Sequence, residues 1–383
     1  MVRFLASADW QLGMTAHFLD DESRPRYQQA RFDAVRRLGD SAREHGCAFI
    51  VVSGDVFESN QLHRSVLARA FEALRTIDVP VYLLPGNHDP LDAGSIFSSE
   101  AFRSGCPEHV HVLDSSTPVP VGEGVEVVGA PWLSKRPLTD LVAGAVGGLE
   151  PDDQVVRILV GHGAVDTLNP DTADPATIVL ERLTSAITER RVTAAILGDR
   201  HSTTEVASRV WYPGTPEVTD RKEPEPGQAL VVEVDHHRCE VTPVRLGQWQ
   251  FTVVDRDLNS GTDVTELDHW LRAQPDKEHT ALWLVLRGTL TLQQAAQLDE
   301  VLVHAGDVFA KVTRWERHED LSVLPDDHDL ADLGLSGFAQ AAADELVAQA
   351  ESDHDTLRTA QDDTAGGAQD ALGLLYRLAA GAR

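Results

Sequence analysis

The sequence predicts an α/β fold, in which a largely parallel sheet carries a functional site at one edge and a smaller second lobe follows. Short apolar runs alternate with stretches of helical spacing as far as about residue 247. Five of those apolar runs stop at polar residues, and four of the five stops contain a glycine. Sheets built from strand–helix–strand units bind ligands at the carboxyl ends of their strands, so the polar stops are the expected site.

The elements of the first lobe follow in chain order. Residues 3–9 form an apolar strand, and residues 29–46 have helical spacing that ends in a glycine. A second strand at 48–55 is followed by a helix at 65–77. The remaining predicted strands are 79–89, 125–133, 155–163, 193–199 and 228–235.

A separate pattern begins near residue 250 and predicts strand, helix, strand, helix and strand in that order. We therefore expect three parts with boundaries at 1–247, 248–324 and 325–383. The last part contains two helical stretches, around 336–351 and 367–380. In the second of these, one apolar face is spaced i, i+3, i+4, i+7, and it either docks on a partner protein or folds back on its own chain. Its residues are Leu372, Leu375, Tyr376 and Ala379.

Composition limits the classes of function. The three cysteines among 383 residues are odd in number and scattered, which favours a reducing compartment over a disulfide framework. The N-terminus does not look like a signal peptide and no apolar run suits a membrane span, so we expect a cytoplasmic protein. A formal net charge of −28 repels nucleic acid and anionic membranes at long range. Any bound anion must therefore be attracted locally, by metal ions or by a small arginine patch.

The five polar stops supply only oxygen and imidazole nitrogen as ligands. One histidine after a strand is usually structural, but five such groups in succession favour a shared site. Two divalent ions roughly 4 Å apart need a bridging carboxylate and several oxygen or nitrogen ligands, and such a pair suits cleavage of phosphoesters. The groups are Asp9-Trp10-Gln11, Gly54-Asp55, Gly86-Asn87-His88-Asp89, Gly161-His162 and Gly198-Asp199-Arg200-His201.

The motifs resemble those of a known family. "GDVFESN", "LLPGNHDPLD", "LVGHG" and "LGDRHS" with the later "YPGTPE" resemble the calcineurin-like metallophosphoesterases, and more narrowly the SbcD-type bacterial DNA repair exonucleases. The resemblance implies a four-layer α/β/β/α sandwich followed by a small α+β cap domain. It also implies that C-terminal helices bind the coiled coil of an SbcC-type, SMC-like ATPase.

The resemblance further implies a role for each residue of the site. Asp55 would bridge two metal ions, and His88 would stand beside the scissile phosphate as the catalytic imidazole. The remaining ligands would be Asp9, Gln11 and His201 for the first ion, and Asn87, His162 and Asp199 for the second.

Two positions depart from the family pattern, because Gln11 and Asp199 stand where histidines are usual. We interpret the change as a more oxygen-rich shell that favours Mn²⁺, with Mg²⁺ possible, over Zn²⁺. The alternative is that Gln11 is a weak or absent ligand and Asp199 only pairs with Arg200.

Other residues extend the predicted site. Glu58, three residues after Asp55, stands where related protein phosphatases carry an acid, so we expect its carboxylate to fix the tautomer of His88; otherwise it is a solvated loop acid. Arg200 lies between two predicted ligands and is expected to contact substrate. A second group of arginines could face phosphates, although they span several helix faces: Arg24, Arg26, Arg31, Arg36 and Arg37.

The preferred function is a metal-dependent DNA nuclease that acts in repair with an SbcC-type ATPase and forms a homodimer. It would associate with the nucleoid when bound to DNA and would not bind membranes. One alternative is a phosphodiesterase or phosphatase acting on small nucleotides, which the net charge favours. Another is a catalytically weakened phosphoesterase that serves as a scaffold for the ATPase.

Overall fold

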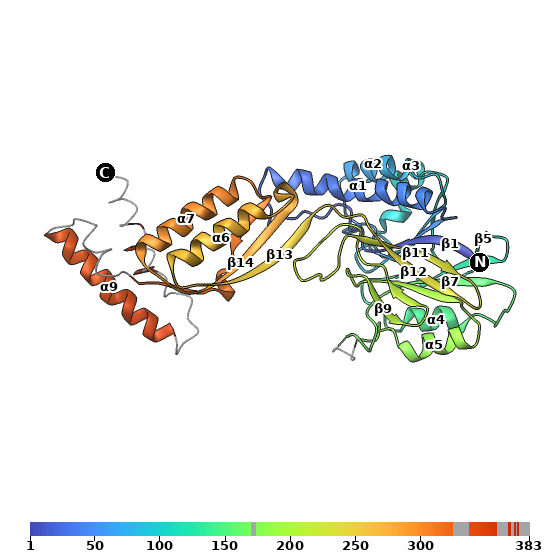
Figure 1. The fold of residues 1–383 in the computed structure, drawn as a ribbon. Coiled ribbons are helices and arrows are strands. Elements are labelled where there is room, and N and C mark those ends of the chain that lie inside the picture. The colour runs from blue at the N-terminus through green and yellow to red at the C-terminus, as the bar shows by residue number, and fades with distance from the viewer. Residues whose placement is uncertain (170–173, 325–336, 358–366, 369–370, 373, 375–383) are drawn as a thin grey trace. The chain divides into compact units, whose positions relative to one another are not determined.

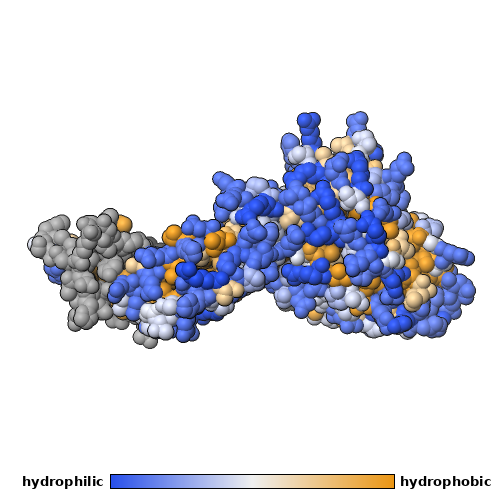
Figure 2. Space-filling model, turned by 45° about the horizontal axis from the view of Figure 1, so that its top comes forward, coloured by the Kyte–Doolittle hydropathy of each residue, from blue (hydrophilic) through white to orange (hydrophobic). Residues whose placement is uncertain are grey.

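The computed structural model describes residues 1–169, 174–324 and 337–357, together with residues 367–368, 371–372 and 374 (Figure 1). The chain divides into two compact units, Met1–Trp249 and Gln250–Arg383. The predicted boundary at residue 325 opens a range, 325–336, that lies outside the described residues. In the described part, no helix combines the length and the apolar character that a membrane crossing requires. The face in Figure 2 is mostly hydrophilic, in keeping with 25% charged residues.

The first sheet of the first unit has six strands in the order β12-β11-β1-β2-β3-β4. The strands β1 to β4 run parallel to one another, and β11 is antiparallel to both β1 and β12. The carboxyl ends of the parallel strands therefore meet at one edge. The strands are β1 (Val2–Ser7), β2 (Ile50–Val52), β3 (Val81–Leu83), β4 (Val110–Val112), β11 (Gln228–Val234) and β12 (Cys239–Arg245).

The second sheet also has six strands, in the order β5-β6-β7-β8-β10-β9. Its central strands β6, β7, β8 and β10 are parallel, and antiparallel β5 and β9 form its two edges. The strands are β5 (Val119–Gly122), β6 (Val125–Gly129), β7 (Val156–His162), β8 (Ala194–Gly198), β9 (Thr204–Ala207) and β10 (Val210–Tyr212).

Helices cover the outer faces of the two sheets (Figure 1). The short 3₁₀ turn η1 (Ile96–Ser98) and the helices α1 (Ser23–Glu44), α2 (Arg64–Leu74) and α3 (Glu100–Gly105) pack on the first sheet, and α4 (Leu141–Gly147) and α5 (Leu180–Thr188) pack on the second. Side chains from both sheets form a further apolar core between them. Three cores between four layers make the α/β/β/α sandwich, and the predicted fold class is confirmed.

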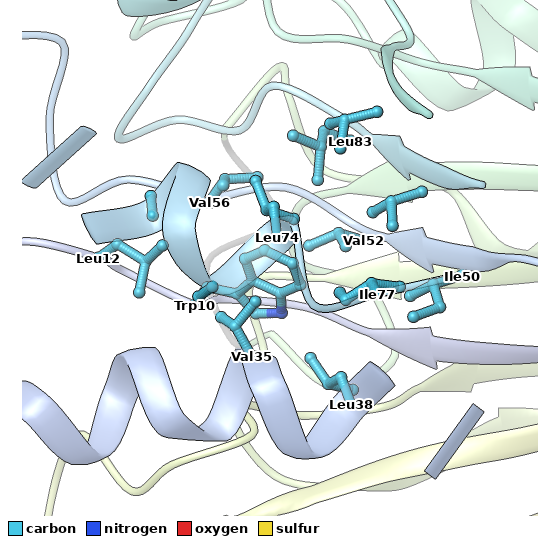
Figure 3. Packing of buried hydrophobic residues seen from close by; sticks show 14 of the residues in the cluster. Trp10, Leu12, Val35, Leu38, Ile50, Val52, Val56, Leu74, Ile77 and Leu83 are labelled. Carbon is cyan, nitrogen blue, oxygen red and sulfur yellow. The ribbon is translucent and has the colours of Figure 1, made fainter. Parts of the chain in front are cut away.

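The core under α1 and α2 anchors the first loop of the predicted site. Figure 3 shows Trp10 pointing into this core, between Val35 of α1 and Leu74 of α2. The indole is 1% exposed, and its Nε1 donates a hydrogen bond to Ser7 Oγ at 2.9 Å. Because Trp10 is held this firmly, its neighbours Asp9 and Gln11 have a fixed backbone.

The predicted elements differ from the observed ones in three ways. The strands β2 and β3 have three residues each, so the predicted strands were too long and the polar residues lie in loops. The edge strands β4, β5, β9 and β12 were missed because their partly exposed residues lack a continuous apolar run, and β10 was missed because it has only three residues. The helix α1 begins at Ser23, six residues before the prediction of 29.

The second unit contains a sheet of four parallel strands in which β14 pairs with β13, β15 and β16. The helices α6 and α7 lie side by side against this sheet and share its core (Figure 1). The elements are β13 (Gln250–Leu258), α6 (Gly261–Ala273), η2 (Lys277–His279), β14 (Thr280–Leu290), α7 (Leu292–Gly306), β15 (Lys311–Arg314), η3 (Glu316–His318), β16 (Asp320–Val323) and α9 (Phe338–Leu357).

Part of the predicted C-terminal stripe packs on its own chain. Leu372 is fully buried and forms a cluster with Leu292 and Ala368, against which Leu346 and Val347 of α9 also pack. For Leu372 the structure shows the fold-back alternative. Leu375, Tyr376 and Ala379 lie outside the described residues.

Candidate metal centre

Loops that follow five strands converge at one place in the first unit. They follow β1, β2 and β3 of the first sheet and β7 and β8 of the second, and the parallel direction of these strands brings their carboxyl ends together. One ligand atom each of Asp9, Asp55 and His162 lies within 4.8 Å of the others, and all three residues are buried. The side chains are therefore spaced as ligands of a shared cation would be.

His162 lies at the centre of the second predicted ligand group. Its Nε2 is 2.6 Å from Asn87 Oδ1, 3.6 Å from Asp55 Oδ1 and 4.0 Å from Asp199 Oδ1. On the other side of the ring, Nδ1 donates to the main-chain carbonyl of Ser53 at 2.8 Å. Burial opposes ionisation, but the carboxylates of Asp55, Asp9 and Asp199 outweigh it and raise the pKa of His162 to about 9. These carboxylates thus favour a positive charge at Nε2, which a divalent cation would supply.

His201 belongs to the first predicted ligand group. Its Nδ1 is 2.8 Å from Glu223 Oε1 and 2.6 Å from Thr219 Oγ1, and its Nε2 is 3.4 Å from Gln11 Nε2. Burial opposes ionisation here too, but the hydrogen bond with Glu223 and the charge of Asp9 raise the pKa of His201 to about 9. Glu223 was not identified from the sequence, because it lies 22 residues beyond His201 in a loop without a recognised motif.

Four of the predicted ligands have a left-handed backbone, which is uncommon for residues other than glycine. The φ angles are 53° for Asp9, 41° for Gln11, 51° for Asp55 and 96° for Asp199. Main-chain hydrogen bonds between the loops hold the first two of these residues. The amide of Asp9 donates to the carbonyl oxygen of Gly54 at 3.0 Å, and the amide of Gln11 donates to the carbonyl oxygen of Asp55 at 2.8 Å. The surrounding loops therefore stabilise unusual conformations at the positions that carry the predicted ligands.

Two glycines allow the second imidazole to approach the main chain. A Cβ atom on Gly54 would lie 2.1 Å from His162 Nδ1, and one on Gly198 would lie 1.7 Å from the carbonyl oxygen of Ser53. Either methyl group would occupy the space of the hydrogen bond between His162 and Ser53. The glycines that end these two apolar runs are thus explained by close packing at the site.

Two buried carboxyl groups of the site are held close to neutrality. Burial, with a smaller contribution from Asp55, raises the pKa of both Asp9 and Asp89 to about 7. Asp89 accepts hydrogen bonds from the amides of Gly86 at 2.7 Å and Phe57 at 2.9 Å, and so ties together the loops after β2 and β3. Carboxylate, amide and imidazole groups in one buried cluster form a donor set that suits a divalent metal ion.

His88 lies at the rim of the cluster with its side chain 37% exposed. Its amide donates to Asp55 Oδ1 at 2.9 Å, and its Nδ1 donates to the main-chain carbonyl of Glu58 at 3.0 Å. The Glu58 carboxylate is 3.9 Å from Nδ1, beyond hydrogen-bond distance. The predicted pairing is corrected only in part: the main chain of Glu58 accepts the hydrogen bond that fixes the tautomer of His88, while the Glu58 carboxylate stays within ion-pair distance of the ring.

Asp199 and Arg200 have different surroundings. The amide of Asp199 donates to both carboxylate oxygens of Asp9, at 3.1 and 3.2 Å, and its Oδ1 faces His162. Arg200 is exposed, and its Nε donates to Thr204 Oγ1 at 2.9 Å. Asp199 is therefore directed into the site, whereas the side chain of Arg200 lies on the adjoining hairpin.

The arginines of the first lobe have internal partners. Arg31 is buried and donates to the carbonyl of Trp10, between two predicted ligands. Arg37 donates to the carbonyl of Leu246 and pairs with Glu217. The others contact residues of the same segment: Arg24 with Asp21, Arg26 with Ser23 and Arg36 with Asp33.

The chain is similar in sequence to one bacterial protein and in backbone to several solved structures. A relative from Bacillus subtilis (strain 168), the uncharacterized metallophosphoesterase YhaO, is 30% identical over 123 residues, which are 30% of this chain and 28% of that protein. Solved structures with similar backbones include TT1561 of Thermus thermophilus and a dimetal phosphatase from Danio rerio. They share 12% and 13% identity, with TM-scores of 0.39 and 0.37, and each comparison covers 64% of this chain and 99% of the other.

A family profile gives the broader assignment. The profile of the calcineurin-like phosphoesterases, which bind two divalent metal ions, matches residues 2–220. That range contains all five loops of the candidate metal centre. The chain belongs to the calcineurin-like phosphoesterase family.

Proposed function

We propose that this chain is a Mn²⁺-dependent nuclease that hydrolyses DNA phosphodiester bonds by a two-metal mechanism. The observation that carries the proposal is the cluster of Asp9, Asp55 and His162, whose ligand atoms lie within 4.8 Å of one another. Around it, close contacts connect the remaining predicted ligands: Gln11, Asn87, Asp199 and His201.

The donor set divides into two groups around Asp55. Asp9, Gln11 and His201 would hold one ion, and Asn87, His162 and Asp199 the other. When bound, the two ions would supply Lewis-acid chemistry by polarising the phosphoryl group and activating the attacking water. The protein contributes ligands whose positions are already set by the five loops.

His88 is the residue that we assign to the leaving group. Because Glu58 O holds the proton on Nδ1, the other ring nitrogen, Nε2, faces the cluster, 3.9 Å from Asp55 Oδ2. From that position the ring, when both of its nitrogens are protonated, can give its Nε2 proton to the departing oxygen or direct that N–H at negative charge on the phosphoryl group. General acid catalysis of this kind contributes about 10²- to 10⁴-fold to rate.

Three observations favour the rival function, cleavage of a small nucleotide. The net charge of −28 disfavours a polyanion, and Arg31 and Arg37 of α1 are engaged by partners inside the protein. The first unit also has a cavity of about 430 Å³, a volume suited to a small ligand. It is lined by Ser59, Asn60, Gln61, Asp92, Ala93, Gly94 and Lys135.

The test compares two substrates in the presence of Mn²⁺: linear duplex DNA and bis-p-nitrophenyl phosphate. The nuclease proposal expects degradation of DNA and loss of about 10²-fold or more in rate for His88→Ala. His237→Ala is a matched control, since this exposed histidine lies in the β11–β12 turn beside the amino end of β1, opposite the candidate site. Hydrolysis of the small ester without cleavage of DNA would favour the rival, and unchanged activity in His88→Ala would contradict both.

We also propose the assembly that the sequence resemblance implies, a homodimer that binds an SbcC-type ATPase through its C-terminal helices. A coiled-coil fragment of such an ATPase should bind the full chain and fail to bind a chain ended at residue 324. Equal binding by both would contradict the proposed attachment.

A further inference from the structure

We propose that Glu223 is a positioning residue for the candidate metal centre, and that it fixes the ring of His201 with Nε2 directed at the first ion. The inference rests on the proposed two-metal function. It adds a residue outside all five sequence motifs and outside the family profile, which ends at residue 220.

Both oxygens of the Glu223 carboxylate are engaged. Oε1 is 2.8 Å from His201 Nδ1 and also accepts a hydrogen bond from the hydroxyl of Thr219. Oε2 accepts from the amide of Thr219 at 2.9 Å. The side chain is 7% exposed. The carboxylate therefore has one orientation, and it presents an acceptor to a single ring nitrogen of His201.

The position of His201 depends on this contact. Its side chain is 24% exposed, whereas that of His162 is fully buried. Packing alone thus leaves His201 room to rotate. With the proton held on Nδ1 by Glu223 and Thr219, Nε2 keeps its lone pair on the side of Gln11. A carboxylate behind a ligating imidazole orients the ring and raises its basicity, and removal of such a partner typically costs about 10- to 100-fold in metal affinity.

The experiment is equilibrium dialysis of the full-length protein against Mn²⁺, with the ions counted per chain. We expect two ions in the unaltered protein and, in Glu223→Ala, one ion with normal affinity and one bound about 10- to 100-fold more weakly. Glu223→Gln retains an oxygen acceptor and should restore most of the affinity. The control is Glu225→Ala, which removes the same charge from an exposed position of the same loop.

A crystal structure of metal-free Glu223→Ala gives a readout that does not depend on the metals. We expect the His201 ring to leave the position in which Nε2 lies 3.4 Å from Gln11 Nε2. A ring that stays in place, or two ions bound with unchanged affinity, would overturn the role of Glu223. An unaltered protein that binds fewer than two ions would instead contradict the proposed function, and the crystal structure would still decide the role of Glu223.

Discussion

The two imidazoles of the candidate metal centre are held in different ways. His162 is fully buried at the end of β7, and a main-chain carbonyl, that of Ser53, accepts its Nδ1 proton. His201 is partly exposed, and its Nδ1 is held by two side chains, those of Thr219 and Glu223. The first arrangement depends on backbone geometry and small residues. The second depends on the chemical identity of a distant loop residue.

This difference predicts where each half of the centre is sensitive. A larger residue at either of the two neighbouring glycines should disrupt the position of His162, because its hydrogen bond to Ser53 occupies the space that their missing side chains leave. Loss of a polar group should disrupt the His201 side, as the Glu223 variants test. Substitutions of the remaining residues then sharpen the contrast.

Gly54→Ala should have the largest effect. The new Cβ would lie 2.1 Å from His162 Nδ1, and the backbone φ of 92° is unfavourable for alanine. Overpacking and the left-handed conformation together should cost roughly 3 kcal/mol of folding free energy, with loss of bound metal. Thermal unfolding and metal analysis measure both. Gly124→Ala is the control, because its φ of 65° is also positive but its nearest contact is 3.4 Å, and about 1 kcal/mol is expected there. Equal effects at the two positions would contradict the steric account.

Gln11→His tests the chemistry of the first ion site. An imidazole should fit here, since histidine tolerates a φ of 41° better than most residues and Gln11 already faces His201. Imidazole suits Zn²⁺ better than an amide oxygen does, so the preference for Zn²⁺ over Mn²⁺ should rise about 10-fold. Competition dialysis with both metals measures it, with Gln29→His on α1 as the control. An unchanged preference would mean that residue 11 does not contact the metal.

Glu58→Gln should have a small effect on catalysis. The hydrogen bond to His88 comes from the main-chain carbonyl of residue 58, which the substitution retains. The rate of phosphodiester hydrolysis should therefore change by less than about 3-fold, well below the roughly 10²-fold loss expected for His88→Ala. A large fall in rate together with a shifted pH–rate profile would restore the carboxylate to the role that the sequence predicted.

Ser53→Ala should have the smallest effect on the centre. The acceptor for His162 is the carbonyl of Ser53, so the bound metal should not change. The hydroxyl donates only to the carbonyl of Ile196, at 3.3 Å, and its loss should cost about 1 kcal/mol of stability. Loss of metal in this variant would show that the hydroxyl, and not the main chain, positions His162.

The sequence predicted the architecture and the groups that converge because both follow from local patterns. Alternating strands and helices imply parallel strands, and parallel strands place their carboxyl ends at one edge. The clusters that contain Asp9, Asp55, Asn87 and His162 could be identified in this way, since each stands at the end of an apolar run, whereas the ligand role of each residue came from the family resemblance.

Tertiary structure decided how those residues are held. The partner of His201 is 22 residues away in a loop, the partner of His88 is a carbonyl group rather than the carboxylate beside it, and Arg31 is buried beneath the first loop instead of facing solvent. Such contacts join segments that meet only when the two sheets pack. Every residue type has a main-chain carbonyl, so the sequence does not indicate which carbonyl accepts a hydrogen bond. The chain alone therefore determined which donors gather, because strand direction is local, whereas their orientation depended on packing between distant segments.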